Sequence, residues 1–136
     1  LGPIVYHGYR THSEALEVQR CADILFLPLA FHGAEIVRTA APGKMGEYLA
    51  SGRPVLAHAP ADSFVAWYMR TYQVGALVDR PDPAALAQTI RQILEEPALR
   101  RTWCENAVAR ARADFDPKVA SARFLGLLQG EKQSGH

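Results

Sequence analysis

The amino-acid sequence predicts an α/β fold in which about four parallel strands form a sheet with helices on both faces. Short apolar runs alternate with segments of helical periodicity, which is the pattern of a parallel sheet whose crossovers are helices. The runs are apolar at successive positions, as expected of strands that are buried on both sides. No internal repeat appears, so we expect a single parallel sheet rather than a repeat array.

Four segments are expected to be strands. Residues 4–6 form a short buried run closed by Gly8, and residues 23–29, 54–59 and 75–79 follow along the chain. In sheets of this kind, ligands bind beyond the carboxyl ends of the strands. The loops after these four segments, and the helix starts that they lead into, are therefore the candidate binding regions.

Helical periodicity and capping residues define the remaining elements. Pro42 is expected to be the first residue of a helix that ends at a left-handed Gly52, and Asp62 is expected to cap the next helix. Residues 30–41 lack a sustained period, so we expect a loop with one helical turn. The predicted helices cover residues 12–22, 42–51, 62–72, 81–96, 97–115 and 117–128.

Size and charge suit one compact domain, expected over residues 1–129, with a disordered polar tail at 130–136. The chain has 136 residues, 49% hydrophobic and 21% charged, and its net charge of +1 predicts neither nucleic-acid binding nor a basic membrane anchor. Cys21 and Cys104 lack the spacing of a metal site, and a cytoplasmic location is expected. The first residue is Leu1 rather than Met, so we expect the back part of a longer protein.

The segment that begins Pro-Gly-Lys combines the features of an anion site. If Pro42 starts the helix, the amides of Gly43, Lys44 and Met45 point out of the helix end, where they attract anions. Gly43 has no Cβ, so a phosphate can approach the backbone closely, and Lys44 adds a positive charge. These features predict a phosphate site at the start of the helix.

Glu47 lies one turn further on, and helical side chains lean toward the N-terminus, so its carboxylate reaches back toward the same end. There it can accept hydrogen bonds from vicinal sugar hydroxyls, which together with the phosphate site describes a nucleoside diphosphate. The alternative is that Lys44 and Glu47 form an ordinary surface pair worth about 0.2–0.5 kcal/mol. Spacing alone leaves both interpretations open.

The run "PGKMGEYLASGRPVLA" resembles the donor-binding half of the retaining GT-B glycosyltransferases of group 1, and the resemblance extends over nearly the whole chain. The stretches "IVYHGYR", "CADILFLPL" and "GALVDRPDPAALAQTI" resemble successive strands and helices of that half. The resemblance implies a partial Rossmann-like C-terminal domain. It also implies transfer of a sugar from a UDP- or GDP-linked donor, with retention at the anomeric carbon and no required metal or other cofactor.

Individual residues match the positions that bind the donor in this family. Glu47 matches the glutamate that holds the ribose hydroxyls. The amides around Gly43, Lys44 and Met45 match the diphosphate cradle of the family. Tyr9, which follows Gly8, matches the position where a loop of this family meets the base of the donor nucleotide.

One position departs from the family pattern. The family signature is a glutamate, seven residues and a second glutamate; counting back from Glu47 places Thr39 at the first position, with Glu35 as a candidate substitute. Thr39 keeps an alternative open, a non-catalytic nucleotide-binding or interaction module on the same scaffold. A receiver domain is excluded because no carboxylate ends the first strand, and neither GxGxxG nor a Walker motif is present. Of the lower-ranked candidates, Arg38 is expected to be solvated and His58 to be a core or rim histidine with satisfied hydrogen bonds.

The resemblance also predicts partners. The acceptor is expected to be held mostly by a missing N-terminal domain, and the full-length protein to lie in the cytoplasm or peripherally at a membrane. The family sheet has the order 3-2-1-4-5-6, and residues 4–6 match its third strand, so its two central strands are missing. Residues 4–6 are then expected either to pair with residues 24–27 or to leave open edges. We expect open edges and a homodimer.

Overall fold

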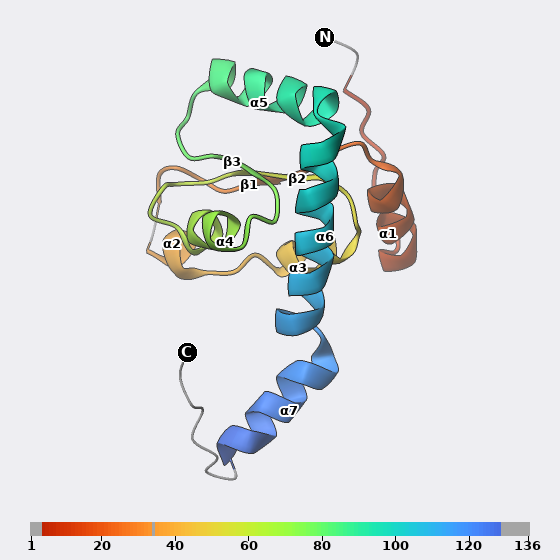
Figure 1. Ribbon diagram of the computed structural model, residues 1–136, viewed down its shortest axis with the longest axis vertical. Helices are drawn as coiled ribbons and strands as arrows, with labels where there is room; N and C mark the ends of the chain where they lie inside the picture. Colours follow the sequence, from red (N-terminus) through yellow and green to blue (C-terminus); the bar gives the residue numbers. More distant parts are fainter. Residues whose placement is uncertain (1–3, 34, 129–136) are drawn as a thin grey trace.

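A computed structural model describes residues 4–33 and 35–128; the expected polar tail at 130–136 lies outside these ranges. Within them, strands β1 (Leu25–Pro28), β2 (Val55–His58) and β3 (Ala76–Val78) form a parallel sheet in the order β1-β2-β3. Figure 1 shows the strands at the centre with helices above and below. The predicted parallel α/β fold is confirmed, and these three strands match the predicted runs at 23–29, 54–59 and 75–79.

Helices follow each strand, and their bounds agree with the periodic segments. Before β1 comes α1 (His12–Cys21), and the loop after β1 contains the single-turn helix α2 (Ile36–Thr39). The remaining helices are α3 (Gly43–Ala50), α4 (Phe64–Tyr72), α5 (Pro83–Glu95), α6 (Pro97–Asp114) and α7 (Pro117–Leu128).

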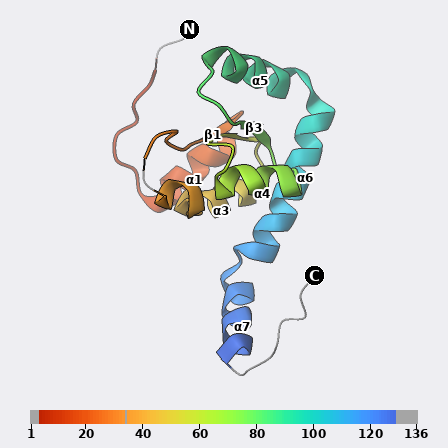
Figure 2. The ribbon, with the colours of Figure 1, turned by 90° about the vertical axis from the view of Figure 1, so that its left-hand side faces the viewer.

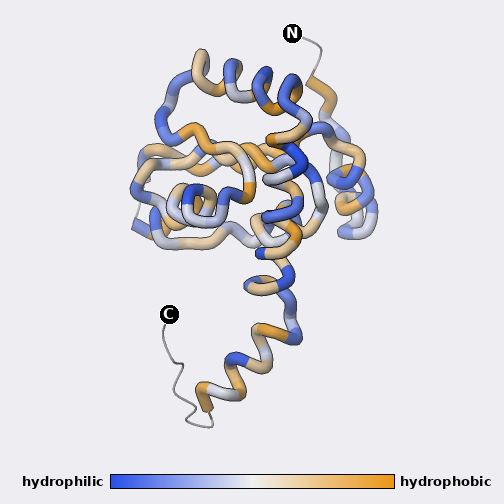
Figure 3. Tube along the Cα trace, viewed as in Figure 1, coloured by the Kyte–Doolittle hydropathy of each residue, from blue (hydrophilic) through white to orange (hydrophobic). Residues whose placement is uncertain are grey.

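The sheet is covered on both faces, because each strand sends alternate side chains to opposite sides. On one face Val55 and Ala57 of β2 contact a core built with α3, α4 and α6. On the other face Leu56 packs with Ile93 of α5. Figure 2 shows α5 on one side of the strands and α3 and α4 on the other, and Figure 3 shows apolar residues along the strands.

The prediction of a strand at residues 4–6 is wrong. These residues have no regular structure, and the side chains of Ile4 and Tyr6 are 100% and 90% exposed. In Figure 1 the segment runs outside the sheet toward α1. A strand needs a neighbour for its backbone hydrogen bonds, and among the described residues neither β1 nor another segment pairs with this one. The described sheet therefore has three strands instead of about four.

Two predicted helix starts are displaced by one residue. Pro42 is the N-cap of α3, in extended conformation, so the helix begins at Gly43. The cap of α4 is Ser63, whose hydroxyl accepts a hydrogen bond from the amide of Ala66, whereas Asp62 does not cap the helix. The left-handed residue expected after α3 is confirmed, since Gly52 has φ of 73°.

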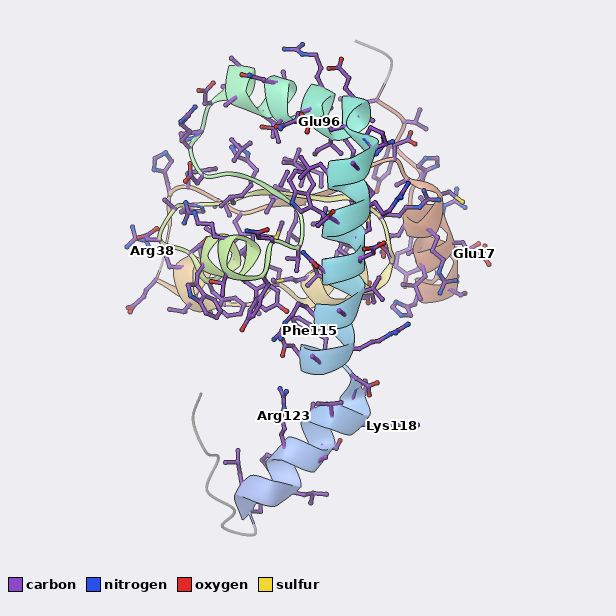
Figure 4. All side chains as sticks on the ribbon, viewed as in Figure 1. Glu17, Arg38, Glu96, Phe115, Lys118 and Arg123 are labelled. Carbon is purple, nitrogen blue, oxygen red and sulfur yellow. The ribbon has the colours of Figure 1, made fainter. Side chains whose placement is uncertain are left out.

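Asp114 joins three helices at the end of α6. Its carboxylate accepts a hydrogen bond from the Tyr68 hydroxyl of α4 at 2.7 Å and pairs with Arg110 of α6. Arg123 of α7 lies 3.7 Å from the same carboxylate and, in Figure 4, points back from α7 toward α6. This cluster fixes α4 against α6 and ties the first turns of α7 to both.

Replacing Tyr68 with phenylalanine tests the cluster. At about pH 8 the loss of the Asp114 hydrogen bond is expected to lower the free energy of unfolding by about 0.5–1.5 kcal/mol. Burial of the ring, followed by the hydrogen bond to Asp114, raises the pKa of Tyr68 to about 12. The stability linked to this group is therefore complete below its ordinary pKa of about 10 and is lost as the pH rises through about 12.

Urea unfolding at about pH 8 and at about pH 11 measures both effects. We expect the unaltered chain to lose more stability than Tyr68→Phe over this interval, because only the unaltered chain contains the titrating hydroxyl. Equal losses in the two proteins would show that Tyr68 titrates as it does in the unfolded chain.

Candidate functional site

The start of α3 lies at the carboxyl edge of the sheet. The chain leaves β1 at Pro28, crosses the α2 loop and enters α3 at Gly43, before returning through Gly52 to β2. Gly43 is exposed, and a Cβ atom added to it would meet no atom within 4 Å. Open space therefore surrounds the first residue of the helix, at the edge where a parallel sheet binds its ligands.

The amides at this helix end are partly available. The amide of Met45 donates to the carbonyl of Pro42 at 2.9 Å, and the Met45 side chain is buried in the core, so the cradle predicted from three amides is reduced to two. Within the described residues, the amides of Gly43 and Lys44 have no backbone or side-chain acceptor, and no side chain caps the helix. Two donors thus remain for an anion at this end.

Lys44 and Glu47 do not contact one another as the surface-pair interpretation requires. Lys44 is exposed and forms no ion pair with any described residue. The carboxylate of Glu47, 35% exposed, lies instead 3.8 Å from Nδ1 of His12, the first residue of α1. The starts of α1 and α3 therefore converge on Glu47.

His12 is a site neighbour that sequence reasoning missed. It is 35 positions from Glu47, and no local pattern links a histidine at the start of one helix to a carboxylate on another helix at that separation. Its place is fixed by the cap of α1, where the Thr11 side chain accepts from the amide of Glu14 and the Glu14 carboxylate accepts from the amide of Thr11. This capping box sets the direction in which α1 begins.

Gly8 and Tyr9 precede this helix start. Gly8 has φ of 69°, which favours glycine, and it turns the chain just before α1. Tyr9 is 98% exposed and lies three residues before His12, a span of at most about 10 Å of extended chain. The ring is therefore at the same end of the molecule as Glu47, without packing contacts that would fix it there.

The other sequence candidates have local roles. The Thr39 hydroxyl donates to the carbonyl of Glu35 at 3.3 Å within α2. Arg38 pairs with Asp62 at 3.1 Å instead of being only solvated. His58 is a rim histidine with a hydrogen-bond partner, as expected: its Nε2 lies 2.9 Å from the Arg80 carbonyl.

A hollow of about 490 Å³ adjoins Glu47 between α3 and the end of α6. It is lined by Gly46 and Glu47 on one side and by Val108, Arg112 and Phe115 on the other. A Cβ on Gly46 would lie 2.9 Å from the Phe115 ring, so the glycine lets α6 approach α3 closely. The contribution of α6 was not predicted, because its residues at this hollow are more than 60 positions from Glu47.

Neither a cluster of metal-binding side chains nor a membrane-spanning helix occurs in the part of the chain that the structure describes. No group of three or more His, Cys, Asp or Glu side chains there is arranged to hold a metal ion. None of the helices in these ranges has the length and apolarity needed to span a bilayer.

Comparison with known proteins decides the family. Residues 2–96 match the family described as "Glycosyl transferases group 1". The chain belongs to this family. The match contains β1 to β3 and the whole of α3, including Gly43, Lys44 and Glu47. No curated protein matches the chain.

Solved structures support the same GT-B fold. Sucrose-phosphate synthase from Thermosynechococcus elongatus is 27% identical, with a TM-score of 0.63 over 86% of this chain and 27% of that chain. WaaG, a glycosyltransferase involved in lipopolysaccharide biosynthesis, is 23% identical, with a TM-score of 0.57 over 91% of this chain and 30% of that chain. The group 1 chain therefore spans less than a third of the length of either neighbour.

Proposed function

We propose that this chain is the donor-nucleotide-binding part of a glycosyltransferase that transfers a sugar from a UDP- or GDP-linked donor with retention. The observation that supports this most is the open start of α3. Gly43 and Lys44 offer two amides without acceptors, and Glu47 stands one turn further on with an accessible carboxylate. The diphosphate is placed on the amides and on Lys44, and the ribose hydroxyls donate to Glu47.

The proposed chemistry is leaving-group stabilisation. As the bond between the anomeric carbon and the diphosphate oxygen breaks, negative charge grows on the diphosphate, and the helix end and Lys44 offset it. The acceptor oxygen forms the new bond to the anomeric carbon on the same face, its proton passes to the departing diphosphate oxygen, and the nucleoside diphosphate leaves. The chain supplies the positioning and the charge; no metal or other cofactor is part of the proposal, and the acceptor is placed on a domain outside this chain.

The neighbour named sucrose-phosphate synthase supports a sugar as the transferred group. A non-catalytic nucleotide-binding module is the second candidate. The observation that favours it concerns Thr39, which stands at the first signature position. Its hydroxyl donates a hydrogen bond to the Glu35 carbonyl. A cytoplasmic location, peripheral membrane attachment and homodimerisation stay predictions.

Calorimetric titration with UDP, GDP and UMP tests the proposal. We expect the diphosphates to bind more tightly than UMP, because the helix end and Lys44 interact with a larger anionic charge. Lys44→Gln is expected to weaken binding of the diphosphates and to reduce the salt dependence, while the matched change Lys118→Gln on α7 leaves both unchanged. Equal affinity for UMP and UDP would contradict the diphosphate site.

Activity separates the two candidates. We expect the isolated chain to transfer no sugar and the longer protein that contains it to release UDP or GDP from a sugar donor when acceptor is present. Tight diphosphate binding by a longer protein that never consumes the donor would favour the binding module.

A further inference from the structure

A second hollow, of about 450 Å³, lies at the opposite end of α3 from Gly43. Arg53 borders it from the turn after α3, and Arg100, Arg101 and Cys104 border it from the first turns of α6. Because the eight residues of α3 span about 12 Å, this hollow is separate from the start of the helix where the donor site is proposed.

The charge around the hollow is mainly positive. Three arginines line it, and Asp23 is the one carboxylate among the described residues that lines it with them. No carboxylate in residues 4–33 or 35–128 forms an ion pair with Arg53, Arg100 or Arg101, although other arginines of the molecule are paired in this way. The three guanidinium groups outnumber this carboxylate and therefore give a net positive field in a concave surface.

Two of the arginines are held in place by backbone carbonyls. Nε of Arg53 donates to the carbonyl of Arg20, and Nη1 of Arg100 donates to the carbonyl of Leu94 at 3.1 Å. These bonds occupy one donor of each guanidinium and leave the others for a ligand. Restraining the long side chains in advance lowers the entropy cost of binding, and a guanidinium matches the geometry of phosphate oxygens.

Cys104 lines the same hollow as the three arginines. Burial raises the pKa of its thiol, and the positive charges of Arg53 and Arg100, which line the same hollow, partly oppose that rise. A thiol that stays neutral does not neutralise the arginines. It also provides a reactive group inside the hollow whose accessibility reports on what occupies it.

We propose that the hollow formed by Arg53, Arg100 and Arg101 binds a phosphate group, at a site distinct from the donor site on α3. The ligand class is a phosphate monoester or diester, carried either by a soluble molecule or by the head group of an anionic lipid. The proposal does not depend on the donor site, since the two hollows share no residue.

Protection of Cys104 from alkylation tests the proposal in a chain that keeps all its arginines. Cys21 is exposed, so Cys21→Ser removes the competing thiol and leaves Cys104 as the reporter. We expect inorganic phosphate, or vesicles of phosphatidylcholine that contain phosphatidic acid, to slow the reaction of Cys104 with N-ethylmaleimide several-fold. Protection by inorganic phosphate assigns a soluble ligand, and protection by the acidic vesicles alone assigns a lipid head group.

A charge-matched pair of variants provides the control. In the Cys21→Ser chain, Arg100→Gln with Arg101→Gln is expected to raise the half-protecting concentration of phosphate or acidic lipid by roughly tenfold or more. Arg91→Gln with Lys118→Gln removes the same charge at exposed positions outside the hollow and is expected to change nothing. The proposal would be overturned if neither probe protected Cys104, or if the two pairs of substitutions weakened the protection equally.

Discussion

Replacing Glu47 with alanine is expected to weaken binding of UDP or GDP by about 1.5–3 kcal/mol, or roughly ten- to a hundredfold. The proposed role of Glu47 is to accept hydrogen bonds from both ribose hydroxyls, and bonds to a charged acceptor are stronger than neutral ones. Glu47→Gln keeps an acceptor oxygen without the charge, so its affinity is expected to fall between those of the alanine variant and the unaltered chain. Calorimetric titration measures all three.

The matched control is Glu17→Ala, which removes the same charge from the outer side of α1, where Figure 4 shows Glu17 pointing into solvent. It is expected to leave nucleotide affinity unchanged. The Glu47 contact with His12 is an exposed pair, so thermal unfolding is expected to change little in Glu47→Ala. Unchanged affinity in this variant would remove Glu47 from the site.

Gly75→Ala is expected to destabilise the fold by about 3 kcal/mol or more, because overpacking next to a rigid backbone cannot be relieved locally. A Cβ at position 75 would lie 2.3 Å from the carbonyl oxygen of Val55 and 2.8 Å from Cε of Met69. Met69 has a flexible side chain, but Val55 belongs to the central strand β2. Relief therefore requires β2 and β3 to separate.

Gly43→Ala is the control for stability, because a Cβ there meets nothing within 4 Å. Urea unfolding is expected to show a clear fall in the midpoint for Gly75→Ala and almost none for Gly43→Ala. Equal midpoints for Gly75→Ala and the unaltered chain would show that β2 and β3 are less closely packed than described.

The elements that could be predicted are those fixed by local chemistry. The apolar runs of β1, β2 and β3 are buried by helices on both faces. Gly52 follows the end of α3 because glycine, which has no Cβ, adopts the left-handed conformation there without a steric penalty. The predicted strand at residues 4–6 failed because an apolar run becomes a strand only where a partner supplies hydrogen bonds. The choice between Asp62 and Ser63 as cap was beyond sequence reasoning, because both residue types cap helices well.

The site was predictable in part for the same reason. Gly43, Lys44 and Glu47 lie on one short helix, so their spacing was enough to bring them together. The Met45 amide is lost from the predicted cradle because it donates to the carbonyl of Pro42, three residues back, in a tightened first turn that no sequence pattern records. Contacts made by His12 and Phe115 depend on how α1 and α6 pack on α3, which no local pattern records.

A nucleoside diphosphate is proposed to bind at the start of α3. The most direct measurement is the change in backbone amide resonances of the nitrogen-15-labelled chain during titration with UDP or GDP. We expect the largest shifts at Gly43 and Lys44 and a smaller shift near Glu47, and we expect UMP to shift the first two resonances much less. Saturable binding that shifts resonances only elsewhere, such as around Arg100 and Cys104, would contradict it.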